Sequence, residues 1–415
     1  MSTENGIEPF GPYTLFDKIG KGGMAEIFLG VTKNEFDAVR VVAIKKILPD
    51  LNTNVDFGDM LINEAKICAN LSSKNVVETY ELGKIDNQYY ISMEYIEGVD
   101  LNKLLYILTK KQTPLPLEFI LFIIIETLKG LDYAHRFASE NGTPLNIIHR
   151  DVSPTNVLIS SQGAVKLCDF GIARASFKEF SPKDHSPKDH SLDDSHIKGK
   201  ISYMSPEHAQ GQDIDRRSDL FSVGILLWEL LNGRRLYKTK DHDETFKKVI
   251  EADIPPLADR GFPEFEMLDA ILRKALAKEP DRRFSTGREF INAIEDYLRI
   301  TELLVSEINF AQFLQTNLSD ELAEEKADRG NKKLEALKLF NNTANKNEKP
   351  EKIIDDEPED RFTLSLIAGT HENENNNIED KTEKSSSKKT IVITAALILA
   401  AASAYALYYF KIINF

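Results

Sequence analysis

The chain is short of cysteine and of positive charge, and each shortage excludes a class of protein. Its 415 residues contain two cysteines, Cys68 and Cys168, which cannot form a disulfide framework and which indicate a reducing compartment. The formal net charge is -14, and a nucleic-acid-binding surface needs a basic face, so we expect no nucleic-acid partner. The N-terminus has neither a basic stretch nor an apolar run, so we expect no signal peptide.

The most informative stretch comprises residues 149–156, HRDVSPTN, followed by the triplet DFG that begins at Asp169. Asp151 is placed to accept or orient the proton of a substrate hydroxyl, and Asn156 and Asp169 offer the oxygen ligands that magnesium prefers. The residues between them predict a hairpin of two short strands, which would bring Asn156 close to Asp169. The alternative is a solvated polar turn, which the full spacing disfavours.

These motifs resemble the catalytic loop and DFG motif of the eukaryotic-type (Hanks-type) serine/threonine protein kinases of bacteria. The pattern HRDVSP, with GK before YMSPE, is most similar to the kinases of myxobacteria-like lineages. The resemblance runs from about Tyr13 to about Leu298 and implies an α+β bilobal fold, with a small β-rich N-lobe and a larger helical C-lobe. It also implies ATP and Mg2+ (or Mn2+) as cofactors and proteins as substrates.

A glycine-rich turn between two predicted strands lies near the N-terminus. In the kinase family the backbone of this loop closes over the phosphates of ATP, and Ala25 stands where the family has its last glycine. The alternative is a plain β-turn. The resemblance assigns ATP binding in this segment to Ile19, Gly20, Lys21, Gly22, Gly23, Met24, Ala25, Glu26 and Ile27.

The run VAIK predicts a strand that ends on Lys45, among apolar neighbours. This lysine needs a partner, because an unpaired buried charge is costly. Glu64, in a helical pattern over residues 60–67, is the favoured partner, and Glu78 and Glu81 are inferior candidates. The alternative for Glu64 is a surface position on a helix. By resemblance, Lys45 holds the α- and β-phosphates of ATP while Glu64 fixes the lysine.

Residues 88–98 predict a strand that continues into a linker, and they resemble the kinase hinge. By resemblance, Met93 lies beside the adenine, and backbone groups of Glu94 and Ile96 bond the edge of the base. Asp100 either reaches the ribose or caps the helix that follows.

Later motifs separate protein kinases from small-molecule kinases. Residues 205–207, SPE, stand where the family has APE, and Arg283 matches the arginine that pairs with Glu207. Asp219 is expected to anchor the backbone of the catalytic loop, and its alternative is a simple charge at a helix N-terminus. His149 is expected to pack near the phenylalanine of DFG rather than to act in catalysis.

Ser153 and Lys200 depart from the family pattern. Serine/threonine kinases usually have lysine at the first position and threonine at the second, and by resemblance these side chains meet the catalytic aspartate. We hypothesise that Lys200 delivers its ammonium to the position that Ser153 leaves vacant. Both residues therefore join Lys45, Glu64 and Asp151 in the predicted catalytic set.

A tandem repeat, SPKDHSPKDH at residues 181–190, occupies the position of the activation loop. This polar segment cannot build a core and is predicted to be mobile, and a metal site at its histidines is the less favoured alternative. By resemblance, Arg150 receives a phosphate on this loop, which would order it. The candidate acceptors are Ser191, Ser195 and Ser202, and the first two are favoured because they lie in the mobile part.

The chain changes character beyond the predicted kinase domain, residues 13–298. Residues 299–340 predict a helical extension, and residues 341–389 predict a disordered acidic linker. Residues 391–410 carry no charge and match a hydrocarbon core of roughly 30 Å, which predicts a single-pass transmembrane helix with the kinase domain in the cytoplasm. The alternative is a buried core helix.

The sequence therefore predicts a membrane-anchored serine/threonine protein kinase that acts in signal transduction and phosphorylates itself, with self-association during that step. The alternative is a catalytically silent pseudokinase that serves as a membrane scaffold, which need not retain Lys45, Glu64, Asp151, Asn156 and Asp169. A small-molecule phosphotransferase is disfavoured by the later motifs.

Overall fold

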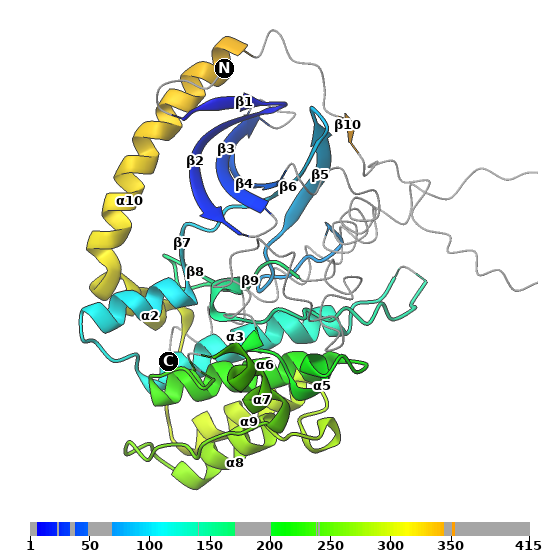
Figure 1. Cartoon of the computed structure of the whole chain (residues 1–415). Helices are drawn as coiled ribbons and strands as arrows, with labels where there is room; N and C mark the ends of the chain where they lie inside the picture. The colour runs from blue at the N-terminus through cyan, green and yellow to red at the C-terminus, as the bar shows by residue number, and fades with distance from the viewer. Residues whose placement is uncertain are drawn as a thin grey trace, which may run out of the picture. The chain divides into compact units, whose positions relative to one another are not determined.

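The computed structural model has two lobes joined by a short linker (Figure 1). The chain divides into two units, residues 1–356 and 357–415, and every described residue belongs to the first. The structure describes residues 6–22, 25–33, 38–48, 69–139, 141–170, 201–237, 239, 241–343 and 351–352.

The small lobe is built on an antiparallel sheet with the strand order β1-β2-β3-β4-β6-β5-β10. Inward-facing side chains of neighbouring strands form its core, and Leu15, Ile44 and Tyr90 are fully buried there. The strands are β1 (Glu8–Phe10), β2 (Tyr13–Lys21), β3 (Ala25–Lys33), β4 (Val39–Ile47), β5 (Thr79–Ile85), β6 (Gln88–Glu94) and β10 (Glu351–Lys352).

A second sheet carries the predicted hairpin, and its strands are β7 (Gly98–Asp100), β8 (Val157–Ser160) and β9 (Val165–Leu167). The hairpin prediction is confirmed, because β8 and β9 pair antiparallel. Just past their paired ends, the N–H of Cys168 donates to the carbonyl of Asn156 at 3.0 Å. A Cβ at Gly98 would lie 2.0 Å from the carbonyl oxygen of Ile159, so only glycine permits this close approach of β7 to β8.

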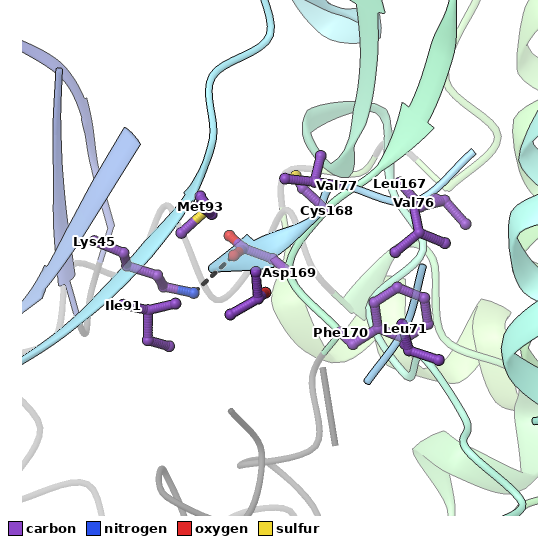
Figure 2. Close-up of a pocket in the computed structure, with 11 residues that line it drawn as sticks. Lys45, Leu71, Val76, Val77, Ile91, Met93, Leu167, Cys168, Asp169 and Phe170 are labelled. Carbon is purple, nitrogen blue, oxygen red and sulfur yellow. Dashed lines mark hydrogen bonds and ion pairs between the residues drawn. The ribbon is translucent and has the colours of Figure 1, made fainter. Parts of the chain in front are cut away.

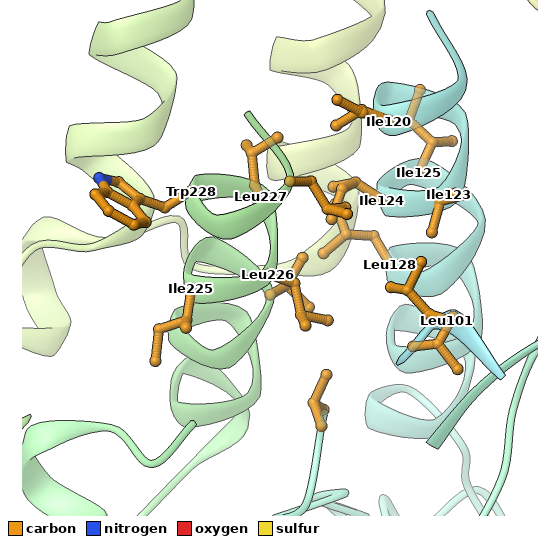
Figure 3. Packing of buried hydrophobic residues seen from close by; sticks show 14 of the residues in the cluster. Leu101, Ile120, Ile123, Ile124, Ile125, Leu128, Ile225, Leu226, Leu227 and Trp228 are labelled. Carbon is orange, nitrogen blue, oxygen red and sulfur yellow. The ribbon is translucent and has the colours of Figure 1, made fainter. Parts of the chain in front are cut away.

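The large lobe is helical, and its core lies between two helices that are apolar around most of their circumference. Figure 3 shows Ile124 and Leu128 of one helix facing Leu226 and Leu227 of the other. The α-helices are α2 (Leu101–Lys110), α3 (Leu117–His135), α5 (Pro206–Ala209), α6 (Arg216–Asn232), α7 (His242–Glu251), α8 (Phe265–Ala275), α9 (Gly287–Ile300) and α10 (Glu307–Thr343), and the 3-10 turns are η2 (Pro154–Asn156) and η4 (Pro280–Arg282).

The region past the predicted kinase domain contains ordered elements that the sequence pattern did not delimit. Helix α10 continues to Thr343, beyond the predicted end of the helical extension at residue 340. Strand β10 pairs with β5 inside the stretch predicted to be a disordered linker. The edge of β5 offers unpaired backbone groups, which explains why a short segment can add to it.

Several predictions concern residues outside the described ranges. Within those ranges, no helix is both long enough and apolar enough to cross a membrane. The predicted segments and residues that lie outside are Gly23, Met24, Glu64, Ser191, Ser195, Lys200, the repeat at 181–190 and the apolar stretch at 391–410.

Candidate active site

A cavity between the two lobes contains an ion pair formed by residues far apart in sequence (Figure 2). The Nζ atom of Lys45, on β4, lies 2.8 Å from Oδ1 of Asp169. Strand β4 continues to Ile47, so the lysine lies within the strand rather than at its end. Its cross-strand neighbours are Ile27 of β3 and Ile91 of β6, which place it between the glycine-rich hairpin and the hinge.

The rest of the cavity lining is mostly apolar, and most of its residues were not predicted to belong to the site. Leu71, Val76 and Ile91 line it together with Met93, the residue predicted to lie beside the adenine. Their only sequence signal is the ordinary pattern of buried apolar residues, which does not distinguish a cavity wall from a core. Such a lining, with a few convergent charged groups, is typical of a ligand site.

The catalytic loop is fixed from the large lobe by Asp219, as predicted. Its carboxylate accepts hydrogen bonds from the backbone N–H groups of His149 and Arg150, both at 2.8 Å, and lies 2.7 Å from Nε2 of His135. Burial acts to raise the pKa of Asp219, but the hydrogen bond and electrostatic attraction of His135, together with the electrostatic attraction and backbone N–H of His149, outweigh it, and the net pKa is lowered. The buried aspartate is therefore held ionised.

His149 has a structural place, and this prediction is confirmed. Its ring lies 4.4 Å from the ring of Phe170, centroid to centroid, and its Nε2 lies 3.0 Å from the carbonyl oxygen of Cys168. Burial lowers the pKa of His149, which keeps the ring neutral. Burial also raises the pKa of the Cys168 thiol, which is half-buried in the cavity lining, and this keeps the thiol protonated.

Asn156 connects the catalytic loop to the hairpin. Its Nδ2 donates to the carbonyl of Asp151 at 2.7 Å, so the amide orientation is set by the loop that carries the predicted catalytic aspartate. The backbone of Cys168 bonds to that of Asn156, and Asp169 is the next residue after Cys168. The hairpin therefore brings Asp169 near Asn156. A carboxylate and an amide so placed have the hard oxygen atoms that magnesium requires. The residues present therefore fit the predicted cofactor.

Ser153 lies next to this arrangement. Its side chain is buried, and its hydroxyl lies 3.0 Å from the hydroxyl of Thr155. The residue predicted to compensate for it, Lys200, lies outside the described residues, so their relation stays a prediction.

The glycine-rich hairpin is paired almost to its tip. Strands β2 and β3 run antiparallel with Lys21 opposite Glu26, and the N–H of Gly22 donates to the carbonyl of Ala25 at 2.8 Å. Glu26 also pairs with Lys18 at 2.5 Å, and the hydrogen bond from that lysine is the main cause that lowers its pKa. Among the described residues, the two strands are therefore held together close to the tip of the hairpin, at Lys21–Glu26 and Gly22–Ala25.

The hinge joins β6 to β7. The backbone N–H of Glu94 donates to the carbonyl of Glu78 at 2.8 Å, and its carboxylate accepts from Nζ of Lys166 at 2.7 Å. Ile96, the second residue predicted to bond adenine, is half-buried in this linker. Asp100 caps α2 by accepting from the N–H of Lys103 at 2.8 Å, which favours the helix-cap alternative.

The SPE motif is joined to the core of the large lobe, as predicted. Arg283 forms two parallel hydrogen bonds of 2.7 Å to the carboxylate of Glu207, and Ser218 donates to the same carboxylate at 2.6 Å. Both partners are buried, so this bidentate pair is desolvated as well as charged.

Fold and site together define a bilobal phosphotransferase with the features of a protein kinase. A family model described as the protein kinase domain matches residues 13–295, and the chain belongs to this family. It is 37% identical over 292 residues to the tyrosine-protein kinase MasK of Myxococcus xanthus, covering 70% of this chain and 44% of that protein. It is 33% identical over 282 residues to the serine/threonine-protein kinase PknB of Mycobacterium leprae, covering 67% and 41%.

A solved structure of the PknI kinase domain of Mycobacterium tuberculosis, in a point-mutant form, matches with a TM-score of 0.50 and 26% identity. The match covers 71% of this chain and 99% of that one. The predicted relationship to bacterial eukaryotic-type kinases, including a myxobacterial one, is confirmed. The chain spans less than half the length of the curated relatives named here.

The pair of Glu207 and Arg283 should make stability depend on pH. Burial raises the pKa of Glu207, but hydrogen bonds from Arg283 and Ser218 outweigh it and hold the pKa at about 2. The folded pKa is below the ordinary value of 4.5, so the stability contributed by ionised Glu207 is complete above about pH 4.5 and is lost as the pH falls towards 2.

We therefore expect the wild type to lose more free energy of unfolding between pH 7 and about pH 3.5 than Glu207→Gln does, measured by urea denaturation. At pH 7 the variant should be less stable by about 3–5 kcal/mol, because Arg283 is left buried without its counter-charge. Glu266→Gln, at an exposed position of α8, is the control and should follow the wild type. Equal losses in all three proteins would contradict the assignment.

Proposed function

We propose that this protein is an ATP-dependent serine/threonine protein kinase that takes part in signal transduction and phosphorylates itself. The observation that carries the proposal is the ion pair between Lys45 and Asp169, in a cavity beside a catalytic loop held by Asp219. The retention of Lys45, Asp151, Asn156 and Asp169 also disfavours a silent pseudokinase. The names of the PknB relatives support serine or threonine as the acceptor.

Each residue of the site has its own role in the proposed phosphoryl transfer. Asp151 positions the acceptor hydroxyl and takes its proton, and the bond from Asn156 to its carbonyl keeps the loop in place. Lys45 supplies a positive charge to the phosphates. Asn156 and Asp169 would hold magnesium (or manganese), which, when bound, neutralises the charge on the β- and γ-phosphates. Met93 and the backbone of Glu94 and Ile96 would hold the base.

Arg150 is suited to receive a phosphate on the activation loop. It adjoins Asp151, it is half-buried, and its Nε has no hydrogen-bond partner among the described residues. Burial lowers the pKa of this guanidinium, which is the cost of keeping a charge there without full solvation. A phosphate on Ser191 or Ser195 would offset that cost and order the loop.

Replacing Asp151 by asparagine should lower phosphoryl transfer about 10²- to 10⁴-fold, because the acceptor hydroxyl loses its proton acceptor. The measurement is transfer of the γ-phosphate of ATP both to the protein itself and to a generic protein substrate. Asp243→Asn, at an exposed position of α7, removes the same charge elsewhere and should leave transfer unchanged.

Mass spectrometry of the wild type after incubation with ATP should place the new phosphate on Ser191 or Ser195. Equal activity of Asp151→Asn and the wild type would sink the proposed mechanism. A phosphate found only outside residues 176–205 would remove the role given to Arg150.

We also propose that Lys200 supplies the ammonium that most serine/threonine kinases carry at the position of Ser153. Lys200→Met should then lower kcat roughly 100-fold, since a charge near the transferred phosphoryl group is lost. The double variant with Ser153→Lys and Lys200→Thr restores the common pattern and should recover activity. Undiminished transfer in Lys200→Met, or no recovery in the double variant, would contradict the exchange.

We propose that residues 391–410 anchor the protein in a membrane, with the kinase domain on the cytoplasmic side. The support is the uncharged sequence of the segment and its length, which suits a hydrocarbon core of roughly 30 Å. The full chain should sediment with membranes and resist extraction by salt, whereas a variant lacking residues 388–415 should be recovered in the soluble fraction. A full-length protein that stays in the soluble fraction would refute the anchor.

A further inference from the structure

Helix α10 lies beyond the matched kinase domain, residues 13–295, yet it packs on both lobes of that domain (Figure 1). In the large lobe, its Phe310 is fully buried and its ring lies 5.3 Å from Phe119 and 5.5 Å from Phe122 of α3. Leu314 and Leu318, on later turns, are buried in the same core. The first turns of α10 are thus part of the large lobe.

The last turns of α10 belong instead to the small lobe. Ala336 is fully buried, and Phe340 packs in the same apolar cluster. The buried strand residues of this cluster are Phe16 of β2 and Leu29 and Val31 of β3. A helix of 37 residues is about 55 Å long at 1.5 Å per residue, which is long enough to span two lobes without a break.

Between these apolar ends, α10 makes polar contacts with the hinge. Nζ of Lys326 lies 2.7 Å from the carboxylate of Glu97, and Nη1 of Arg329 donates to the hydroxyl of Tyr95 at 3.1 Å. Tyr95 stands between Glu94 and Ile96, whose backbone groups are assigned to the adenine. The helix therefore contacts the linker that would hold the base.

The same face of α10 also reaches β2, the strand that leads into the glycine-rich loop. The carboxylate of Asp17 accepts from Nζ of Lys332 at 2.9 Å through one oxygen and from Nε of Arg329 at 3.3 Å through the other. Asp17 is 17% exposed, so this pair of contacts is shielded more than a surface ion pair is. The pairing of β2 with β3 is irregular on both sides of Asp17, between Leu15 and Asp17 and between Lys18 and Gly20. An irregular strand is set less firmly by its own ladder, so an outside contact has more influence on it.

We propose that α10 is a strut between the lobes, and that Arg329 and Lys332 are positioning residues that hold β2 and the hinge in place for ATP. The inference rests on the proposed ATP site. Arg329 bonds both to Tyr95 of the hinge and to Asp17 of β2. The first turns of α10, the helix that carries Arg329, are packed in the large lobe. Loss of these contacts should make β2 and the glycine-rich hairpin more mobile over the nucleotide site, without disturbing the catalytic loop.

The test compares the double variant Arg329→Gln, Lys332→Gln with Lys338→Gln, which changes an exposed lysine on the same helix. The double variant should raise the KM for ATP roughly fivefold or more and leave kcat at saturating ATP near the wild-type value. Direct titration of the protein with ATP should show a matching loss of affinity. Hydrogen exchange in residues 13–21 should be faster in the double variant and unchanged in the control.

Asp17→Asn supplies an independent arm. It should reproduce the part of the rise in KM that comes from β2. Combining it with the double variant should add little, because that variant already removes both of the side chains on α10 that bond to Asp17. The strut is refuted if the wild type binds ATP and the double variant binds it equally well. It is also refuted if kcat falls with an unchanged KM, which would indicate general loss of structure. A wild type that does not bind ATP would instead contradict the proposed function.

Discussion

The buried carboxylate of Asp219 is the interaction on which the arrangement of the site depends. It sits on α6, in the core of the large lobe, and two consecutive backbone N–H groups of the catalytic loop bond to it. A buried charge is tolerated only when hydrogen bonds replace the water it has lost, so the loop cannot move away without leaving that charge unsolvated. The position of Asp151 is therefore determined by the packing of α6 against α3.

Two residues with side chains adopt the left-handed backbone conformation beside this anchor. Arg150 has φ 66° and Asp169 has φ 56°, values that glycine reaches at less cost. The first is restrained by its N–H bond to Asp219, and the second by its ion pair with Lys45 and by the hairpin that precedes it. Strain of this kind persists only where neighbouring contacts determine the conformation. In this site it falls on the residue before the catalytic aspartate and on a residue assigned to the metal.

Much of the site could be predicted because its signals are local or are fixed spacings. The hairpin after Asn156, the cap at Asp100 and the anchor at Asp219 follow from turn chemistry and motif order. The packing of α10 on β2 could not be predicted, because its buried positions alternate with charged ones whose partners, such as Asp17, lie some three hundred residues earlier. No spacing rule pairs residues so distant, and Lys332 has the sequence signature of a solvent-exposed helix charge.

The burial of both ends of α10 has a consequence for how this domain can be isolated. A fragment that stops at residue 298 would keep every kinase motif but would bare apolar surface at two separate places. One lies over Phe119 and Phe122 in the large lobe, and the other lies over Phe16 in the small lobe. Exposed patches of this kind favour self-association and precipitation. A fragment that keeps both places covered must therefore extend at least to Phe340, well past the point where the sequence motifs of the domain end.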